Sequence, residues 1–395
     1  MQLDIAGGQD NNELPPDATD IPSVILGAQP RTAITTAAVD VFYRLGTART
    51  FLNGRGRAFT SHSTGVEQIR NQAWTRDFTI DGALALGARS GLVPLVRRTY
   101  EPLFLFGAFD ALPGLVEGAA PDFQTVPGVT RQTWQSDEAS IGLYRNFTRR
   151  QMATVRIGRR TQRPTEGLGL DNATGSAAVH YAWTLGRAGG LDVNYRYIDT
   201  TQAYQQEGDQ RLTTQTLSAG FHVRRRLSPS RSLDFTMRGG LSRSRAALFP
   251  QPEVKIAQPI YVLSLGTQLT RSWSITAEAG RQVDVLFGLT PEPFATQAVS
   301  LGTSGNLSRR LQADLSVAYS RGEGMVSAND SYGTVFSANS LQYALWRNVA
   351  IFASYTYYRQ VLDDVTVVQP LFPGFYERHS VRVGATIWVP VLGRR

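Results

Sequence analysis

Apolar and polar residues alternate along most of the chain, and residues 217–242 show the pattern clearly. Leu217, Phe221 and Val223 belong to an apolar set at every second position, with small or polar residues between them. After the polar segment SPSR the same alternation resumes over 233–241. A period of two residues is that of a β-strand with one apolar and one polar face. The segment therefore predicts a hairpin of two strands joined by a tight turn.

The same alternation recurs from one end of the chain to the other. The expected strands lie near residues 1–8, 33–45, 50–62, 76–88, 94–107, 132–146, 151–160, 174–185, 190–199, 212–226, 231–242, 259–269, 273–283, 296–306, 310–321, 332–344, 348–361 and 378–391. Their number is about eighteen, with about sixteen as the alternative, because boundaries read from sequence carry errors of a few residues. An even count lets the first and last strands pair antiparallel, which removes both edges of the sheet.

Short and long connections alternate between these strands. The short links are 45–49, 147–150, 186–190, 227–231, 269–272, 307–310 and 345–348. The long segments, rich in Pro, Gly and Asp, are 108–131, 161–173, 200–210, 243–258, 284–295, 322–331 and 362–376. Short turns at one end and long loops at the other are typical of a bacterial outer-membrane barrel. A soluble sandwich would instead bury the apolar faces of two sheets in one core.

Together these patterns resemble the Gram-negative outer-membrane β-barrels of porin size. The resemblance covers essentially the whole chain and rests on pattern, not on a short motif. Aromatic residues near the expected strand ends suit an interfacial girdle: Tyr43, Phe147, Trp183, Trp273, Trp346, Tyr355 and Tyr357. The final residues, WVPVLGRR, depart from the terminal aromatic residue common in this family. The resemblance implies an all-β, antiparallel, up-and-down transmembrane barrel, one domain over 1–395, in contact with outer-membrane lipid.

Composition excludes several classes of protein and of site. The chain has 395 residues, 42% of them hydrophobic, but no apolar run long enough for a membrane-spanning helix. It contains no cysteine, so disulfides and thiolate metal sites are excluded. The opening MQLDIAGGQDNN has neither a basic region nor an apolar core of the kind found in secretory leaders. For a protein outside the cytoplasm, we therefore expect the numbering to start after a removed leader.

The polar faces of the strands would line a lumen wide enough for an aqueous passage. The candidate pore-lining residues are Asp40, Arg44, Arg55, Arg57, Asp81, Arg156, Asp192, Arg196, His222, Arg224, Asp234, Arg238, Glu278, Asp314 and Arg382. Arginine exceeds carboxylate in this set, as it does in a chain of net charge +8. Such a wall either simply hydrates the lumen or provides a positive field that favours anions. The pairs Arg97/Arg98, Arg149/Arg150 and Arg309/Arg310 are expected near short turns, as a basic rim.

Segment 108–131 is the longest internal loop expected from the sequence, and it is unusually apolar. Phe109, Leu112, Leu115 and Phe123 are its candidate functional residues. An exposed loop seldom carries so many apolar side chains. We expect this segment either to constrict the lumen or to dock on another protein.

Signals for other chemistry are weak. Four histidines lie far apart in the sequence and show no metal-ligand spacing, so no metal or cofactor is expected. A lipid hydrolase would need serine and histidine on the lipid-facing surface, whereas His180 and His222 are expected to point inward. Basic residues are spread over many strands instead of forming one stripe, which argues against nucleic-acid binding. We therefore expect a protein that is not an enzyme.

Three functions remain open. The first is a channel for small polar or anionic solutes, and the second is an outer-membrane conduit for polysaccharide or another polymer, with a periplasmic export partner. The third is a structural or adhesive surface barrel whose loops bind a partner.

Overall fold

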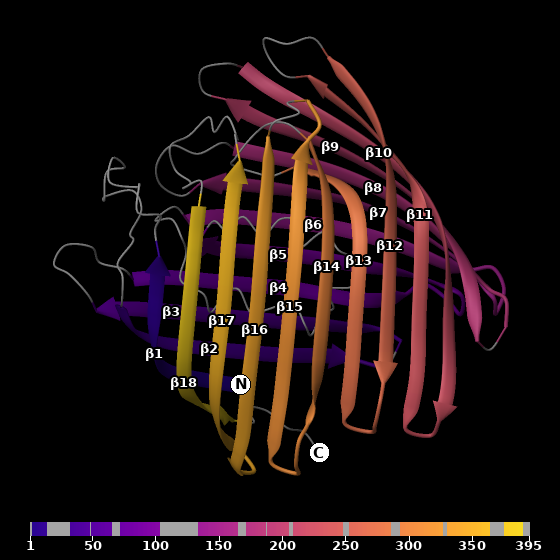
Figure 1. Ribbon diagram of the computed structural model, residues 1–395. Helices are drawn as coiled ribbons and strands as arrows, with labels where there is room; N and C mark the ends of the chain where they lie inside the picture. Colours follow the sequence, from indigo (N-terminus) through magenta and orange to yellow (C-terminus); the bar gives the residue numbers. More distant parts are fainter. Residues whose placement is uncertain are drawn as a thin grey trace.

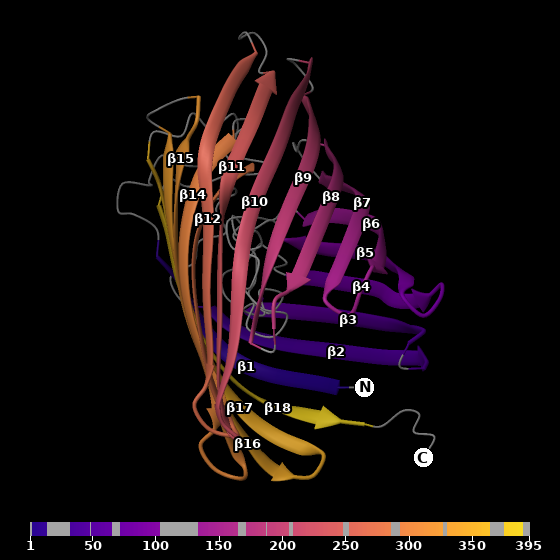
Figure 2. The ribbon, with the colours of Figure 1, turned by 90° about the vertical axis from the view of Figure 1, so that its right-hand side faces the viewer.

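The computed structural model shows an all-β chain whose 18 strands close into one antiparallel barrel. The structure describes residues 2–13, 32–47, 49–64, 72–102, 133–164, 171–186, 188–204, 208–247, 253–285, 293–326, 330–363 and 375–389. Figures 1 and 2 show the strands surrounding one central space. No helix long and apolar enough to cross a membrane occurs in this described part of the chain.

The strands follow one another around the barrel in sequence order. They are β1 Gln2–Glu13, β2 Thr32–Gly46, β3 Phe51–Thr64, β4 Gln72–Ala85, β5 Ser90–Pro102, β6 Thr133–Asn146, β7 Gln151–Pro164, β8 Asp171–Thr184, β9 Gly189–Tyr204, β10 Gly208–Ser228, β11 Arg231–Ala247, β12 Val254–Gln268, β13 Trp273–Val285, β14 Pro293–Asn306, β15 Leu311–Gly324, β16 Ser331–Trp346, β17 Val349–Asp363 and β18 Phe375–Trp388. They range from 12 residues in β1 to 21 in β10, longer than the roughly 9–11 residues a tilted strand needs to cross a bilayer.

Strand β1 closes the sheet. It pairs with β18 from Gln2↔Trp388 to Glu13↔Glu377, and with β2 on its other side. Because every strand then has two neighbours, the sheet has no free edge to leave backbone groups unpaired in lipid. The closure confirms the expected antiparallel barrel of about eighteen strands.

The short turns gather at one end of the barrel, and the turn between β2 and β3 depends on a glycine. At the β2–β3 turn Gly46 has a φ of +111°, a backbone conformation that favours glycine. A Cβ atom at this position would lie 2.2 Å from the carbonyl oxygen of Thr50. Glycine is therefore required for the chain to reverse here.

Pairing between β4 and β5 is interrupted beside Pro94. The ladder stops after Asp81↔Leu95 and resumes at Leu84↔Leu92. Proline has no backbone N–H to donate, so it removes a ladder hydrogen bond where it stands inside a strand. The interruption follows directly from the sequence.

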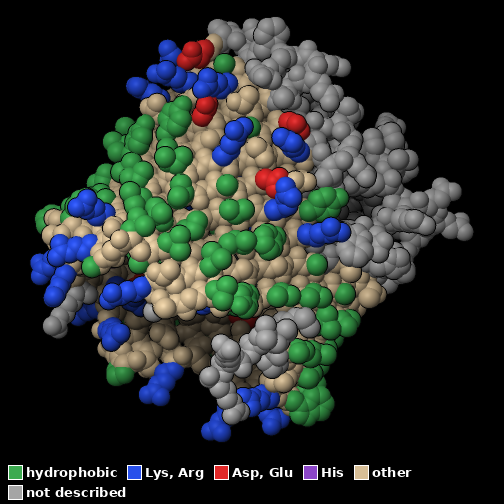
Figure 3. All heavy atoms as spheres, turned by 180° about the vertical axis from the view of Figure 1, so that it is seen from behind, with side chains coloured by type: hydrophobic (Ala, Val, Ile, Leu, Met, Phe, Trp, Pro, Cys, Tyr) green, Lys and Arg blue, Asp and Glu red, His purple; other side chains and the backbone are tan. Residues whose placement is uncertain are grey.

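Side chains alternate between the outer and inner faces of the barrel. Large apolar side chains are exposed on the outer face, among them Leu217 (57% exposed), Leu265 (41%) and Val383 (60%). Small and polar side chains such as Ser218 and Ser244 are buried on the inner face. Figure 3 shows one outer wall as a field of hydrophobic side chains with Lys and Arg along both borders. This is the surface expected of a wall in contact with lipid.

Aromatic side chains pack together on the inner face near the loop ends of β14–β17. The rings of Phe294 and Tyr332 lie 5.6 Å apart, and both side chains are buried. The Tyr332 hydroxyl shares a 2.9 Å hydrogen bond with the hydroxyl of Thr296. To reach it, the ring crosses Gly322 of β15, where an added Cβ would lie 1.9 Å from a ring carbon. The glycine thus provides the space for the tyrosine.

Replacing Gly322 by valine should therefore displace the Tyr332 ring and lower the free energy of unfolding by about 1–3 kcal/mol. Urea unfolding of the barrel in lipid vesicles, followed by tryptophan fluorescence, measures the change. Gly333→Val is the control, because a Cβ at Gly333 meets nothing within 4 Å. Equal stability of the two variants would show that the close approach over Gly322 is unimportant.

Candidate functional site: the charged inner wall

The inner face carries all of the residues that were expected to line the lumen. The strand register places them on one side of the sheet: Asp40, Arg44, Arg55, Arg57, Asp81, Arg156, Asp192, Arg196, His222, Arg224, Asp234, Arg238, Glu278, Asp314 and Arg382. Their exposure differs widely. Asp192, Glu278 and Arg382 are buried, whereas Arg156 and Arg196 are exposed. The wall therefore divides into paired and open positions.

Asp40 of β2 lies at the centre of the first ion-pair group. Its carboxylate oxygens are 3.6 Å from Nη2 of Arg55 and 3.4 Å from Nε of Arg57. Arg57 lies opposite Asp77 of β4 in the register. Asp77 in turn accepts a 3.0 Å hydrogen bond from Nη2 of Arg97 on β5. Opposite charges thus alternate across neighbouring strands from β2 to β5.

The alternation continues over β6 and β7. Arg97 faces Glu138 in the register, and Glu138 faces Arg160. The Nε of Arg160 also donates a 2.9 Å hydrogen bond to Oγ of Ser136. Opposite charges on facing strand positions attract, and each partly exposed pair contributes a few tenths to about 1 kcal/mol. The register alone places Glu138 between these two arginines, and within the described strands it forms no ion pair with Arg160.

Asp192 of β9 forms a second group with Arg238 of β11. Nη2 and Nε of Arg238 lie 2.8 Å and 3.0 Å from Oδ2 of Asp192. The intervening strand β10 places Gly220 between them, so no side chain blocks the arginine. Nε2 of His180 lies 3.8 Å from the same oxygen. Asp192 is only 6% exposed, and a buried carboxylate without such a partner would cost several kcal/mol.

Most other candidates have a neighbour that holds them at the wall. Those with a measured contact are Arg224 with Asp234 at 3.2 Å, Asp81 with Asn53 at 3.0 Å, Glu278 with Ser264 at 3.0 Å, Asp314 with Gln312 at 3.1 Å, and Arg44 over the Phe51 ring at 4.5 Å. The ring of His222 lies beside Gly190, where an added Cβ would be 2.5 Å from Cε1.

Arg156 and Arg196 differ from this pattern. Both are exposed, and neither forms an ion pair or a side-chain hydrogen bond with any residue that the structure describes. They face Ala178 of β8 from its two sides, so two strand spacings, about 10 Å, separate their backbones. Gly142 and Ala178 beside them are small. The wall of β7–β9 therefore presents two guanidinium groups whose charge no carboxylate within the described strands offsets.

The paired groups are themselves asymmetric. The side chain of Asp40 is 18% exposed, whereas that of its partner Arg55 is 61% exposed. Asp77 is 17% exposed against 44% for Arg97. In these two pairs the arginine side chain extends further from the wall than its carboxylate, whereas Arg57, the other partner of Asp40, is only 10% exposed. At these two pairs a solute in the lumen therefore meets the guanidinium group before the carboxylate.

Sequence reasoning missed part of this wall. Asp77 lies four residues before Asp81 and therefore points to the same inner face. The two-residue alternation of the strand could have identified it as a pore-lining residue. The expected position of Arg97 and Arg98 near a short turn is wrong: Arg97 points inward to Asp77, and Arg98 points outward to Asp137. The run LVPLV before them is apolar on both faces, so alternation could not fix where β5 begins.

Arg149/Arg150 and Arg309/Arg310 lie in short turns, as expected. The candidate constriction residues Phe109, Leu112, Leu115 and Phe123 lie outside the described residues. Among the described residues, no cluster of three or more His, Asp or Glu side chains could hold a metal ion.

Comparison with known proteins relates the chain to solved barrels by fold. No protein-family model matches it, and no curated protein matches it in sequence. The apoprotein form of the FrpB iron transporter from Neisseria meningitidis matches with a TM-score of 0.52 and 8% identity, over 97% of this chain and 68% of that chain. A second FrpB variant matches with a TM-score of 0.50 and 7% identity, over 98% and 81%. The unliganded ferric citrate transporter FecA gives 0.48 and 14%, and the match spans 97% of this chain and 63% of FecA.

At such low identity the likeness concerns the fold alone. It agrees with the independent evidence of the molecule itself, namely closure of the sheet, strands long enough to cross a bilayer and an apolar outer face. The chain is a closed, 18-stranded antiparallel β-barrel with the fold of the Gram-negative outer-membrane proteins.

Proposed function

We propose that the protein is an outer-membrane channel that passes small polar solutes and favours anions. The observation that carries the proposal is the pair of exposed arginines on the inner face, Arg156 and Arg196, which form no ion pair with any part of the chain that the structure describes. Rings or clusters of arginine in a channel wall select for anions. The exposed arginines of the Asp40–Arg55 and Asp77–Arg97 pairs add to the same field. No catalytic group is invoked, because the charges act by attraction alone.

The selectivity should depend on ionic strength. Exposed charges act over roughly 8 Å at physiological salt and over roughly 30 Å at 0.01 M. In a wide, wet lumen the field therefore reaches a permeating ion mainly at low salt or at a constriction. A weak, salt-sensitive preference is expected, not a strict filter.

Planar-bilayer recording of the refolded barrel tests the proposal. Under a gradient of potassium chloride at low concentration, the reversal potential should have the sign of a chloride preference, and the preference should shrink as salt is raised. A cation-selective wild type would falsify the anion channel.

Deletion of segment 108–131 provides a second experiment with the same recording. On the sequence-based expectation that it constricts the lumen, its deletion should raise single-channel conductance. A pore that is closed in the wild type and opened by the deletion would instead favour a polymer conduit that waits for a periplasmic partner. A barrel closed in both forms would favour a structural or adhesive role.

A further inference from the structure

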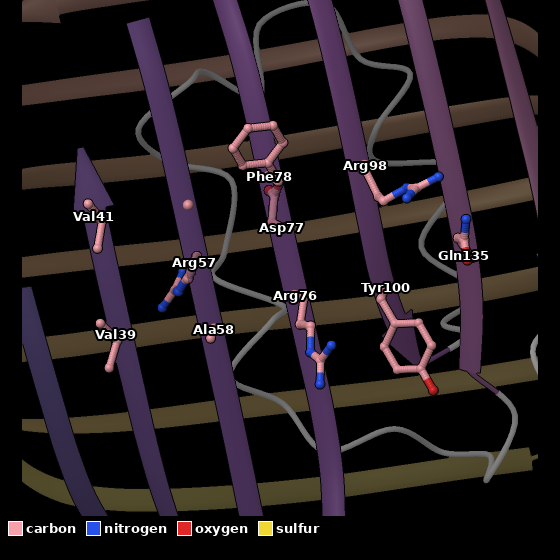
Figure 4. A pocket seen from close by; sticks show the side chains of 11 residues that line it. Val39, Val41, Arg57, Ala58, Arg76, Asp77, Phe78, Arg98, Tyr100 and Gln135 are labelled. Atoms are coloured by element: carbon pink, nitrogen blue, oxygen red, sulfur yellow. The ribbon is translucent and has the colours of Figure 1, made fainter. Parts of the chain in front are cut away.

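The outer wall of β2–β6 contains a groove of about 770 Å³ (Figure 4). Its sides are formed by Val39 and Val41 on β2 and by Phe78 on β4. Phe78 and Val41 are 49% and 46% exposed, so these walls stand open to the surrounding phase. In a barrel with an outer-membrane fold, that phase is lipid. The groove therefore opens on the lipid-facing surface, although Arg57 and Asp77 of the inner wall also line it.

The floor of the groove is β3, whose outer face is nearly without side chains at this point. Gly56 and Ala58 line the groove. A Cβ placed on Gly56 would meet no atom within 4 Å, and the same is true of Gly54 beside it. An open strip of backbone between larger apolar walls has the shape and the polarity to take a hydrocarbon chain.

One end of the groove is polar and basic. Arg76, Tyr100 and Gln135 line it on β4, β5 and β6, and the register continues this row to Arg163 on β7. Arg76 is exposed and forms no ion pair with the described residues. Three strand spacings, about 15 Å, separate Arg76 from Arg163. The row therefore places two polar side chains, Tyr100 and Gln135, between two cations, and the Gln135 amide donates a 2.8 Å hydrogen bond to Asp137.

Arg98 adds a third cation beside this row. It lines the groove, its side chain is 65% exposed, and its Nε donates to the carboxylate of Asp137 on β6. Figure 4 shows Arg76, Arg98 and Tyr100 extending from neighbouring strands along the same side of the groove. Among the described residues, Arg76, Arg98 and Arg163 outnumber the nearby carboxylates of Asp137 and Asp171, so this end carries a net positive charge.

The position of the two ends matches the layers of a membrane. The basic row starts beside the floor, where the register pairs Ala58 with Arg76, and approaches the loop ends of the strands as it crosses them. Ala58 lies six residues from the end of β3, whereas Tyr100 and Gln135 each lie two residues from the end of their strand. Hydrocarbon occupies the middle of a bilayer and anionic headgroups its edge. Basic side chains at that edge attract anionic lipid by about 1 kcal/mol each.

We propose that this groove binds one phosphate-bearing lipid of the leaflet on the loop side, with an acyl chain along Gly56 and Ala58 and its phosphates at Arg76, Arg98 and Arg163. The charge complementarity selects an anionic lipid over a neutral one. The length of the arginine row suits a headgroup that carries two separated phosphates. The site is independent of whatever passes through the lumen.

Native mass spectrometry of the full-length barrel in a neutral detergent, titrated with diphosphoryl lipid A, tests the proposal. The wild type should retain one molecule and bind it more tightly than monophosphoryl lipid A, which has similar chains and one phosphate fewer. The double variant Arg76→Ala/Arg163→Ala should bind about 20- to 30-fold more weakly, the effect of two headgroup arginines. Gly56→Leu should also weaken binding, because its side chain fills the floor.

Matched variants separate the groove from general surface properties. Arg245→Ala removes an outward, exposed arginine on β11, and Gly333→Leu adds a side chain where a Cβ meets no atom within 4 Å. Both should bind lipid A like the wild type, and all variants should keep the heat-modifiable mobility of a folded barrel. Equal loss in Arg245→Ala and in the Arg76/Arg163 variant would overturn the site in favour of unspecific charge. Full competition by inorganic phosphate, or unchanged binding in Gly56→Leu, would overturn the acyl-chain groove.

Discussion

Arginine in place of Leu265 is expected to lower the free energy of unfolding by up to about 4 kcal/mol, because the cost of a cation on the lipid face rises toward the midplane of the membrane. Leu265 lies on the outer face of β12 and is 41% exposed. Its neighbours in the row are Ala277 and then Leu301 on the next strands, so no carboxylate is near enough to compensate the charge. Urea unfolding in lipid vesicles measures the loss.

The inner face supplies the control for this experiment. Thr276 is on β13, next to Ala277 in the chain, and points to the opposite side of the same wall. Thr276→Arg keeps its guanidinium in a polar environment and should cost far less than Leu265→Arg. Equal costs for the two variants would mean that the assignment of inner and outer faces is wrong.

The fold could be predicted from the sequence because the alternation of residues within each barrel strand shows which of its faces is apolar and which is polar. Leu217 and Phe221 point outward for the same reason that Ser218 and His222 point inward, and no long-range information is needed to see it. The short turns, such as 269–272, then fix which strands are neighbours. Closure required only the observation that the first residues, beginning at Gln2, make a strand to pair with the last.

Which charged side chains form ion pairs could not be predicted in this way. Alternation places both Arg196 and Arg238 on the inner wall, but only the register shows that Arg238 reaches Asp192 across Gly220. Ion pairs join residues of different strands, and a shift of the register changes every partner. The outer groove was missed for a similar reason, because Gly56 and Phe78 become neighbours only through the pairing of β3 with β4.

This distinction decides which arginines to change in a test of selectivity. Arg238 is a poor choice, because its removal leaves the buried Asp192 without its main partner and endangers folding. Removal of Arg156 and Arg196 leaves no orphaned carboxylate among the described residues. Any change in permeation can then be assigned to the field in the lumen.

The double variant Arg156→Ala/Arg196→Ala should lose most of the anion preference at low salt. A unit charge about 10 Å from an ion in water contributes about 0.4 kcal/mol, with opposite sign for anion and cation. Loss of two such charges should lower the anion-to-cation permeability ratio several-fold at about 0.01 M salt, where screening reaches roughly 30 Å. Reversal potentials in planar bilayers measure the ratio.

The control is Arg243→Ala/Arg245→Ala, which changes the net charge equally but on the outer face of β11. If that control shifts the ratio as much as the inner pair does, the preference arises from the charge of the whole protein and not from the wall of β7–β9.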